Sequence, residues 1–146
     1  LIDDVRDLDV ARGRQLDLIG AQYNEPRGKA DDSFYRVMIR SKIMTNKGDS
    51  SVNGLLSMIY LSLGVEKSPI EIKSVVGEPN TIVINNIPLN WSKNEWERDY
   101  IIARIIASVS AGIRVDSVSF MDRSKGVLNV TGLTTNTFTY HVTGGS

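Results

Sequence analysis

The sequence contains no cysteine among its 146 residues. This absence excludes a disulfide framework, a thiolate metal site and a cysteine nucleophile together. Histidine occurs once, as His141, and no H-x-x-x-H or D-x-D-x-D-G spacing is present. We therefore expect no cofactor and no metal ion. We interpret His141, which lies among threonines in a terminal strand pattern, as a solvated residue rather than a general base.

Long apolar runs and an excess of one charge are also lacking. No run approaches the roughly 20 apolar residues that cross a bilayer, and no secretory signal pattern is present. Lys plus Arg and Asp plus Glu number 17 each, so the formal net charge is zero. Because nucleic-acid binding depends on many phosphate contacts from basic residues, we expect neither nucleic acid nor a membrane as partner. Little long-range repulsion opposes protein–protein association.

The chain begins at Leu1 rather than at a methionine, and its first twenty residues resemble a segment entered partway. This start raises the question of residues upstream. The length suits one domain, or two small lobes that share a core.

Three helical patterns occupy the first part of the chain. The first runs over residues 5–19 with only approximate spacing, and Gly20 is its predicted stop. The second, in "KADDSFYRVMIRSKIMTNKG", has apolar residues on one helical face. These are Tyr35, Met38, Ile39 and Ile43. The third, in "DSSVNGLLSMIYLSLG", is capped by Ser50 or Ser51 and ends at Gly64.

After Gly64 the apolar period changes to that of strands. "SPIEIKSVV" and "NTIVINNIP" flank the turn sequence "GEPN" and predict a hairpin. "SKNE" predicts a capping box with Ser92 as N-cap and Glu95 at the third helical position, before a helix that Gly112 ends. In "GIRVDSVSFMD" the alternation slips by one residue, which predicts a bulge near Asp116–Ser117.

The last strand patterns are "VLNVTG" and "TFTYHVT", the second with Phe138, Tyr140 and Val142 on one face. Helices precede strands more than they alternate with them, so we predict an α+β fold. Its three regions are an N-terminal helical region (1–65), a ββαβ lobe (66–122) and a β-hairpin tail (123–146).

The stretch "EPRGKADDSFYR" places three acids, three bases and a serine within twelve residues. Asp31, Asp32 and Ser33 suggest a catalytic group, but a serine nucleophile needs a base oriented by a third group, and the sequence offers none nearby. Capping of the second helix by Asp31 or Asp32 explains the same residues, and we favour it.

Arginines and tryptophans are the remaining candidates for function. Arg27, Arg36 and Arg40 can pair within the chain or with the carboxylates of a partner protein, and pairing within the chain is favoured. The intramolecular candidates are Asp17, Asp31 and Asp32. Trp91 and Trp96 fit a hydrophobic staple around the predicted cap, in preference to an aromatic platform for a ligand.

Residues 10–65 resemble a family of baseplate wedge or baseplate structural proteins of contractile-tailed bacteriophages and prophages. The shared pattern is L-D-x-[IL]-G, an arginine loop, D-D-x-x-Y-R, a helix ending in N-K or N-G, and a capped helix ending L-G. The matching residues are Leu16, Asp17, Ile19, Gly20, Arg27, Asp31, Asp32, Tyr35, Arg36, Asn46 and Gly64. The likeness continues as topology through the ββαβ lobe, and the segment beyond Val127 departs from it.

The resemblance implies a structural part of a virion rather than an enzyme. Copies of the chain would assemble in the host cytoplasm with other baseplate and tail proteins around the central hub. The structural and interface candidates are Arg27, Asp31, Asp32, Tyr35, Arg36, Arg40, Trp91, Trp96, Phe138 and Tyr140.

Two alternatives stay open. The chain can be an adaptor that links tail or fibre proteins by strand addition along Phe138–Val142. A cell-wall hydrolase is the more remote alternative, and it requires a pair of carboxylates such as Glu95 with Asp99 or Asp116.

Overall fold

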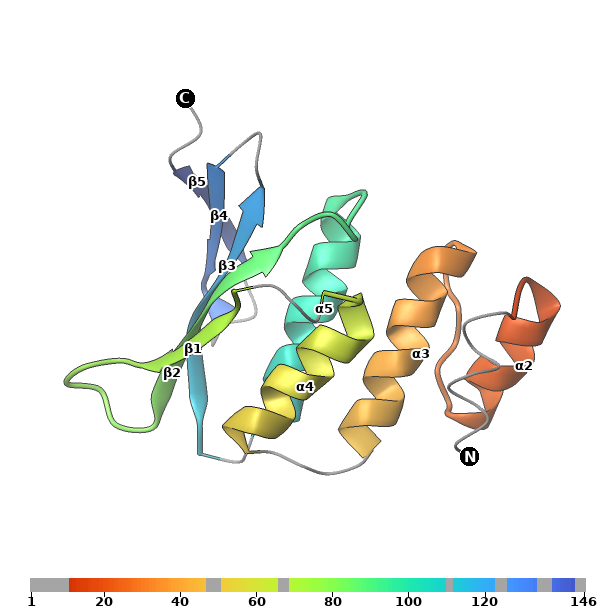
Figure 1. Cartoon of the computed structure of the whole chain (residues 1–146), viewed down its shortest axis with the longest axis horizontal. Helices are drawn as coiled ribbons and strands as arrows, with labels where there is room; N and C mark the ends of the chain where they lie inside the picture. The colour runs from red at the N-terminus through yellow and green to blue at the C-terminus, as the bar shows by residue number, and fades with distance from the viewer. Residues whose placement is uncertain are drawn as a thin grey trace.

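The computed structural model describes residues 11–46, 51–65, 69–109, 112–122, 126–133 and 138–143. The elements in chain order are α2 (Arg14–Gln22), α3 (Asp32–Asn46), α4 (Val52–Leu63), β1 (Glu71–Ser74), β2 (Thr81–Pro88), α5 (Glu95–Ser108), β3 (Arg114–Asp122), β4 (Gly126–Thr131) and β5 (Thr139–Thr143). The fold is α+β, with helices in the N-terminal half and strands toward the C-terminus, as the sequence predicts (Figure 1).

The strands form one mixed sheet in the order β1-β2-β3-β4-β5. The predicted hairpin is confirmed, because β1 and β2 pair antiparallel. β2 and β3 pair parallel, with α5 as the crossover between them. β4 pairs antiparallel with both β3 and β5, so the C-terminal strands extend the same sheet. The helices gather on one side of this sheet, with α4 and α5 nearest to it, then α3 and then α2 (Figure 1).

Among the described residues, the buried apolar side chains form one continuous cluster between the helices and the sheet. Those with no exposed surface are Leu16, Ile39, Ile84, Ile87, Ile102, Ile105, Val118, Phe120 and Val130. They come from α2, α3, α5 and the three central strands, so helices and sheet share one core. Such burial supplies most of the driving force for folding.

The predicted bulge in β3 is confirmed. Ile82 faces Val115 and Val83 faces Ser117, so Asp116 is the extra residue in the ladder. Strict alternation would place Val115 and Val118 on opposite faces, since they are three residues apart. The bulge turns both side chains into the core, where both are buried.

The prediction that Gly20 ends its helix is wrong, because α2 continues to Gln22. A Cβ at position 20 would lie 1.8 Å from the hydroxyl oxygen of Tyr35. That hydroxyl donates a hydrogen bond of 2.6 Å to the carbonyl of Glu25. Glycine is therefore required by the close approach of Tyr35 and not by helix termination.

The predicted cap of α5 is wrong by two residues. The N-cap is Asn94, whose side chain accepts from the N–H of Glu97 at 3.2 Å. Glu97 in turn accepts from the N–H of Lys93 at 2.7 Å, while the Ser92 hydroxyl donates to the carbonyl of Asn94. Because the N-cap is Asn94, Trp91 and Trp96 are not at the two staple positions, and the prediction that they form a hydrophobic staple is wrong. The helix also ends at Ser108, before the predicted stop at Gly112.

The caps of α4 agree with prediction. Ser51 accepts from the N–H of Gly54 at 3.1 Å, and Gly64 ends the helix in the left-handed conformation at φ 69°. The predicted end of α3 at "NKG" extends past Asn46 into residues outside the described part. Of the predicted 5–19 helix, residues 5–10 also lie outside it, and residues 11–13 are not helical, because α2 begins at Arg14 after Gly13.

Candidate interaction site

Arg27, in the loop between α2 and α3, is the centre of a polar cluster. Its Nε donates to the Asp17 carboxylate at 2.7 Å, and its Nη2 lies 2.9 Å from the Asp32 carboxylate. The same guanidinium donates to the carbonyls of Gly13 and Ala30 at 3.2 and 3.1 Å. The hydrogen bond that Arg27 donates to Asp17 is the main cause that raises the pKa of Arg27. The predicted pairing of Arg27 within the chain is confirmed, and we call these residues the Arg27 cluster.

Both aspartates at the start of α3 are engaged. Asp31 accepts from the N–H of Phe34 at 2.8 Å and forms an ion pair with Lys93, so the capping interpretation is confirmed. Lys93 first, and then the Phe34 N–H, hold the pKa of Asp31 below its usual value. The N–H of Gly13 and then Arg27 lower the pKa of Asp32. These bonds favour the charged carboxylates.

Glu25, in the same loop, is buried and reaches α5. One carboxylate oxygen accepts from Arg104 at 2.7 Å, and the other accepts from the hydroxyl of Tyr100. Glu25 is 6% exposed, so this is an internal ion pair. Burial, followed by the bond to Glu25, raises the pKa of the Tyr100 hydroxyl. We call Glu25, Tyr100 and Arg104 the Glu25 cluster.

The Glu25 cluster was not predicted from the sequence. Glu25 lies 75 and 79 residues from Tyr100 and Arg104, respectively. The spacing of Tyr100 and Arg104 puts them one turn apart on one face of α5, and this shared face could have been predicted from the sequence. Nothing in the local sequence names Glu25 as their common partner.

Aromatic side chains join the same elements. Phe34 of α3 lies 6.4 Å from Trp91, 5.2 Å from Trp96 and 5.8 Å from Tyr100, measured between ring centroids. Trp91 also lies 6.0 Å from Phe120 of β3, and its indole N–H donates to a main-chain carbonyl. Both tryptophans are half-buried and pack against the core. They therefore fix α3 and α5 to the sheet.

The remaining candidates all lie in the described part of the fold. They are Arg36, Arg40, Phe138 and Tyr140. Arg36 donates to the carbonyl of Ala11 at 2.8 Å, and Arg40 is half-buried on α3. Phe138 packs against the core. The hydroxyl of Tyr140 donates to Asp99 on α5, and burial followed by this bond raises its pKa.

Carboxylates and His141 do not gather into a metal site in the described part of the chain, where no group of three or more potential ligands is found. His141 is exposed on β5. Of the carboxylates considered for hydrolysis, Glu95 and Asp116 are exposed, and Asp99 is engaged by Tyr140. No described helix is long and apolar enough to cross a membrane.

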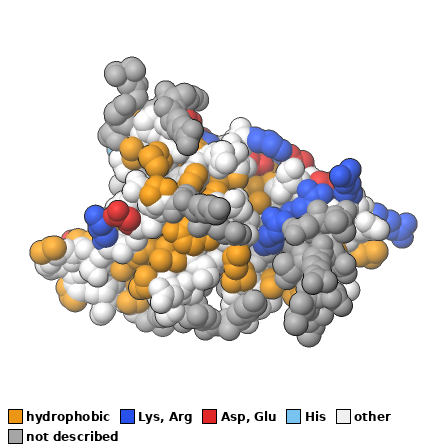
Figure 2. Space-filling model, viewed as in Figure 1, with side chains coloured by type: hydrophobic (Ala, Val, Ile, Leu, Met, Phe, Trp, Pro, Cys, Tyr) orange, Lys and Arg blue, Asp and Glu red, His pale blue; other side chains and the backbone are white. Residues whose placement is uncertain are grey.

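Lys and Arg side chains gather on the viewed face over the α2–α3 end of the molecule, and apolar side chains gather nearer the sheet (Figure 2). A shallow hollow of about 610 Å³ lies beside the Arg27 cluster, lined by Asp17, Ala21, Asn24, Glu25, Pro26, Arg27 and Tyr35. Comparisons with protein-family models, with curated proteins and with solved structures gave no match.

Proposed function

We propose that this chain is a structural subunit of a contractile phage tail baseplate, a wedge component that assembles with other tail proteins around the hub. Its place is then the virion. The proposal starts from the sequence resemblance over residues 10–65. It is supported by what the residues of that resemblance do in the fold.

The observation that carries the proposal is the meeting of five motif residues in one packed unit: Asp17, Gly20, Arg27, Asp32 and Tyr35. Asp17 and Asp32 bind Arg27, and the Arg27 guanidinium lies 4.6 Å from the centroid of the Tyr35 ring. Gly20 gives the Tyr35 hydroxyl room to reach the main chain. The motif therefore fixes backbone segments to one another, which is a structural role.

The Glu25 cluster and the aromatic side chains connect this unit to α5 and the sheet. A buried ion pair and packed rings leave few alternative arrangements, so the connection is stiff. A subunit that transmits displacement between neighbours during contraction needs such stiffness. The zero net charge also leaves copies free to pack closely.

The test is co-expression of a tagged chain with the baseplate and tail proteins of a contractile-tailed phage or prophage that encodes it. Size-exclusion chromatography with mass measurement is expected to show a hetero-complex of several chains. An Arg27→Ala variant should weaken the complex, whereas Arg114→Ala, which breaks an exposed pair with Glu78, should leave it unchanged. A stable monomer that binds none of the co-expressed proteins would overturn the proposal.

A second candidate is an adaptor that binds a partner by strand addition, and the position of β5 favours it. β5 is the last strand of the sheet, and its outer edge pairs with no described strand. Such an edge presents main-chain groups that a partner strand can pair with.

Removing residues 127–146 is too coarse a test of strand addition, because Val130 is in the core. Proline substitutions along 139–143, made one at a time, are sharper. A proline that leaves the fold intact but abolishes partner binding supports strand addition. If every folded proline variant still binds, the adaptor hypothesis fails.

A further inference from the structure

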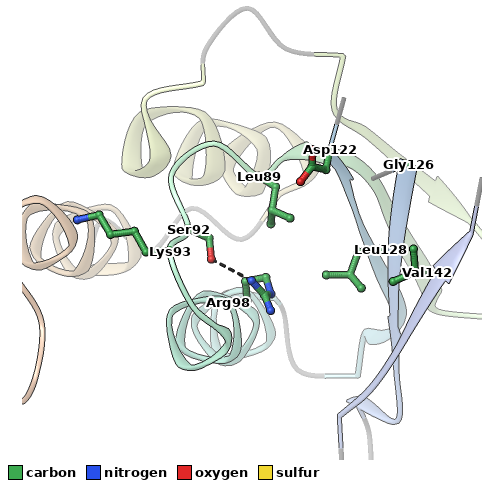
Figure 3. A pocket seen from close by; sticks show the side chains of 8 residues that line it. All are labelled: Leu89, Ser92, Lys93, Arg98, Asp122, Gly126, Leu128 and Val142. Atoms are coloured by element: carbon green, nitrogen blue, oxygen red, sulfur yellow. Dashed lines mark hydrogen bonds between the residues drawn. The ribbon is translucent and has the colours of Figure 1, made fainter. Parts of the chain in front are cut away.

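A pocket of about 300 Å³ opens between the start of α5 and the ends of the C-terminal strands (Figure 3). Its lining residues are Leu89, Ser92, Lys93, Arg98, Asp122, Gly126, Leu128 and Val142. They come from the segment before α5, from α5 itself and from β3, β4 and β5. We call this site the Arg98 pocket.

Arg98 has few partners for its charge. Its Nε is buried and has no hydrogen-bond partner, and its Nη1 makes a long bond of 3.4 Å to the Ser92 hydroxyl. The guanidinium lies 5.6 Å from the centroid of the Tyr140 ring. Arg98 takes part in none of the ion pairs found among the described residues, whereas Arg27, Arg104 and Arg114 each have a carboxylate within 3 Å.

A half-buried cation without an anion is costly, because the protein interior stabilises charge less than water does. The pocket has two other charged residues, of which Lys93 is itself a cation and Asp122 forms no ion pair with Arg98. Lys93 points away from the pocket toward α3, where it pairs with Asp31 (Figure 3). Asp122 lies across the pocket beside Leu89 (Figure 3). An incoming anion would therefore be drawn to the α5 wall and repelled from the Asp122 wall.

The rest of the lining is apolar. Leu89, Leu128 and Val142 surround the pocket in front of Arg98 (Figure 3). Val142 is 63% exposed on β5, so its side chain has apolar surface that a bound group would cover. The complementary group is a carboxylate on a short apolar stem.

We propose that the Arg98 pocket binds an Asp or Glu side chain of a partner protein. The carboxylate accepts from the Nη groups of Arg98, and its aliphatic stem packs on Leu128 and Val142. This inference rests on the proposed function, since it assigns one contact by which the subunit holds a neighbour in the assembly.

Hexanoate serves as the probe, because it carries a carboxylate on an apolar stem. The readout is the Nε–Hε signal of Arg98 in nitrogen–proton NMR spectra of the isolated chain. We expect a saturable shift of this signal with hexanoate, and none with hexanamide, which has the same shape without the charge. Arg98→Gln lacks this signal and is followed by the main-chain amide signal of Leu128, which also lines the pocket. This variant should bind hexanoate about tenfold or more weakly, as expected for a lost charge-assisted bond. Arg114→Gln, on the exposed start of β3, is the matched control and should bind as the unmodified chain does.

Val142→Glu is a second variant, at a position where exposure makes loss of folding a small risk. Its own carboxylate is expected to fill the pocket, shift the Arg98 signal without any ligand and abolish hexanoate binding. Absence of a saturable shift in the unmodified chain, equal binding of hexanamide, or unchanged binding by Arg98→Gln would each overturn the inference. Those results leave the co-expression experiment untouched, so a failed pocket and a failed baseplate assignment are distinguishable.

Discussion

At the scale of single residues, Glu25 is a buried charge whose removal should destabilise the fold. It is the anion for Arg104 and the acceptor for the Tyr100 hydroxyl, and its side chain is 7% exposed. Neutralising one partner of a buried pair leaves the other charge without compensation.

We therefore expect Glu25→Gln to lower the free energy of unfolding by about 3 kcal/mol. The measurement is urea unfolding followed by circular dichroism. Glu78→Gln is the control, because Glu78 forms an exposed pair with Arg114, and its change should stay within about 0.5 kcal/mol. Equal effects of the two variants would mean that the Glu25 cluster contributes nothing beyond a surface pair.

From the raised pKa values of two tyrosine hydroxyls we predict a loss of stability in alkaline solution. Burial first, and then Glu25, raise the pKa of Tyr100 above its ordinary value of 10.0. Above pH 10 the unfolded chain releases this proton while the folded chain keeps it, so the free energy of unfolding falls as pH rises. The stabilisation is complete below pH 10 and is lost toward the folded pKa.

Urea unfolding at pH 9, 10 and 11 should show this decline, and it should be shallower in Tyr100→Phe. Tyr140 has a pKa raised in the same direction, so the double variant with Tyr140→Phe should be shallower still. Parallel curves for all three chains would contradict the assignment.

Residue-level prediction from the sequence succeeded where partners are close along the chain. Arg27 and Asp17 are ten residues apart, and the loop between them keeps the choice of partners small. Arg104 and Glu25 are far apart, and their pairing depends on how α5 packs against the loop. Burial of a Glu cannot be predicted from composition, because glutamate is seldom buried unless it is paired.

At the scale of elements, the start of α5 shows why a cap is hard to place. "SKNEWE" contains two overlapping capping patterns, Ser92 with Glu95 and Asn94 with Glu97. The structure uses the second pattern, in which Glu97 is buried and binds the N–H of Lys93. With this cap, Trp96 packs against Phe34. Such a contact between distant segments cannot be predicted from the local sequence.

Asn94→Ala should therefore destabilise the chain by about 1 kcal/mol, as loss of an N-cap does. Ser92→Ala, which removes an exposed hydroxyl, should change stability by less than about 0.5 kcal/mol. Thermal unfolding of both variants decides between the two registers. A larger effect for Ser92→Ala would support Ser92 as the N-cap of α5.

The bulge at Asp116 is the opposite case, since it was predictable from the sequence. A one-residue slip between two buried valines has few structural solutions, so the pattern itself indicated the irregularity. The pairing partner was not predictable, because alternation alone does not say that β3 lies parallel to β2.

At the scale of the whole molecule, helices and sheet share one core, although the chain order suggests three regions. Phe34 of α3 packs against Tyr100 of α5 and against Trp91, and Trp91 packs against Phe120 of the sheet. A shared core should make unfolding cooperative.

We expect the helical signal in circular dichroism and the fluorescence of Trp91 and Trp96 to change together in one transition with urea. The midpoints should agree within experimental error. Two separate midpoints would show that the helical region and the sheet unfold independently, and would favour the division at residue 65.

The α+β class was predictable because helical and strand periods occupy separate parts of the chain. The order of the strands and the side on which the helices lie were not, since both arise from contacts between distant segments.

The turn between β1 and β2 projects from the sheet at the end away from α2 (Figure 1), and within it Val76 is 99% exposed. Because the chain has no cysteine, Val76→Cys would create a unique thiol at this tip. A dye or photo-crosslinker attached there would report which neighbour the tip approaches in an assembled particle, without disturbing the core.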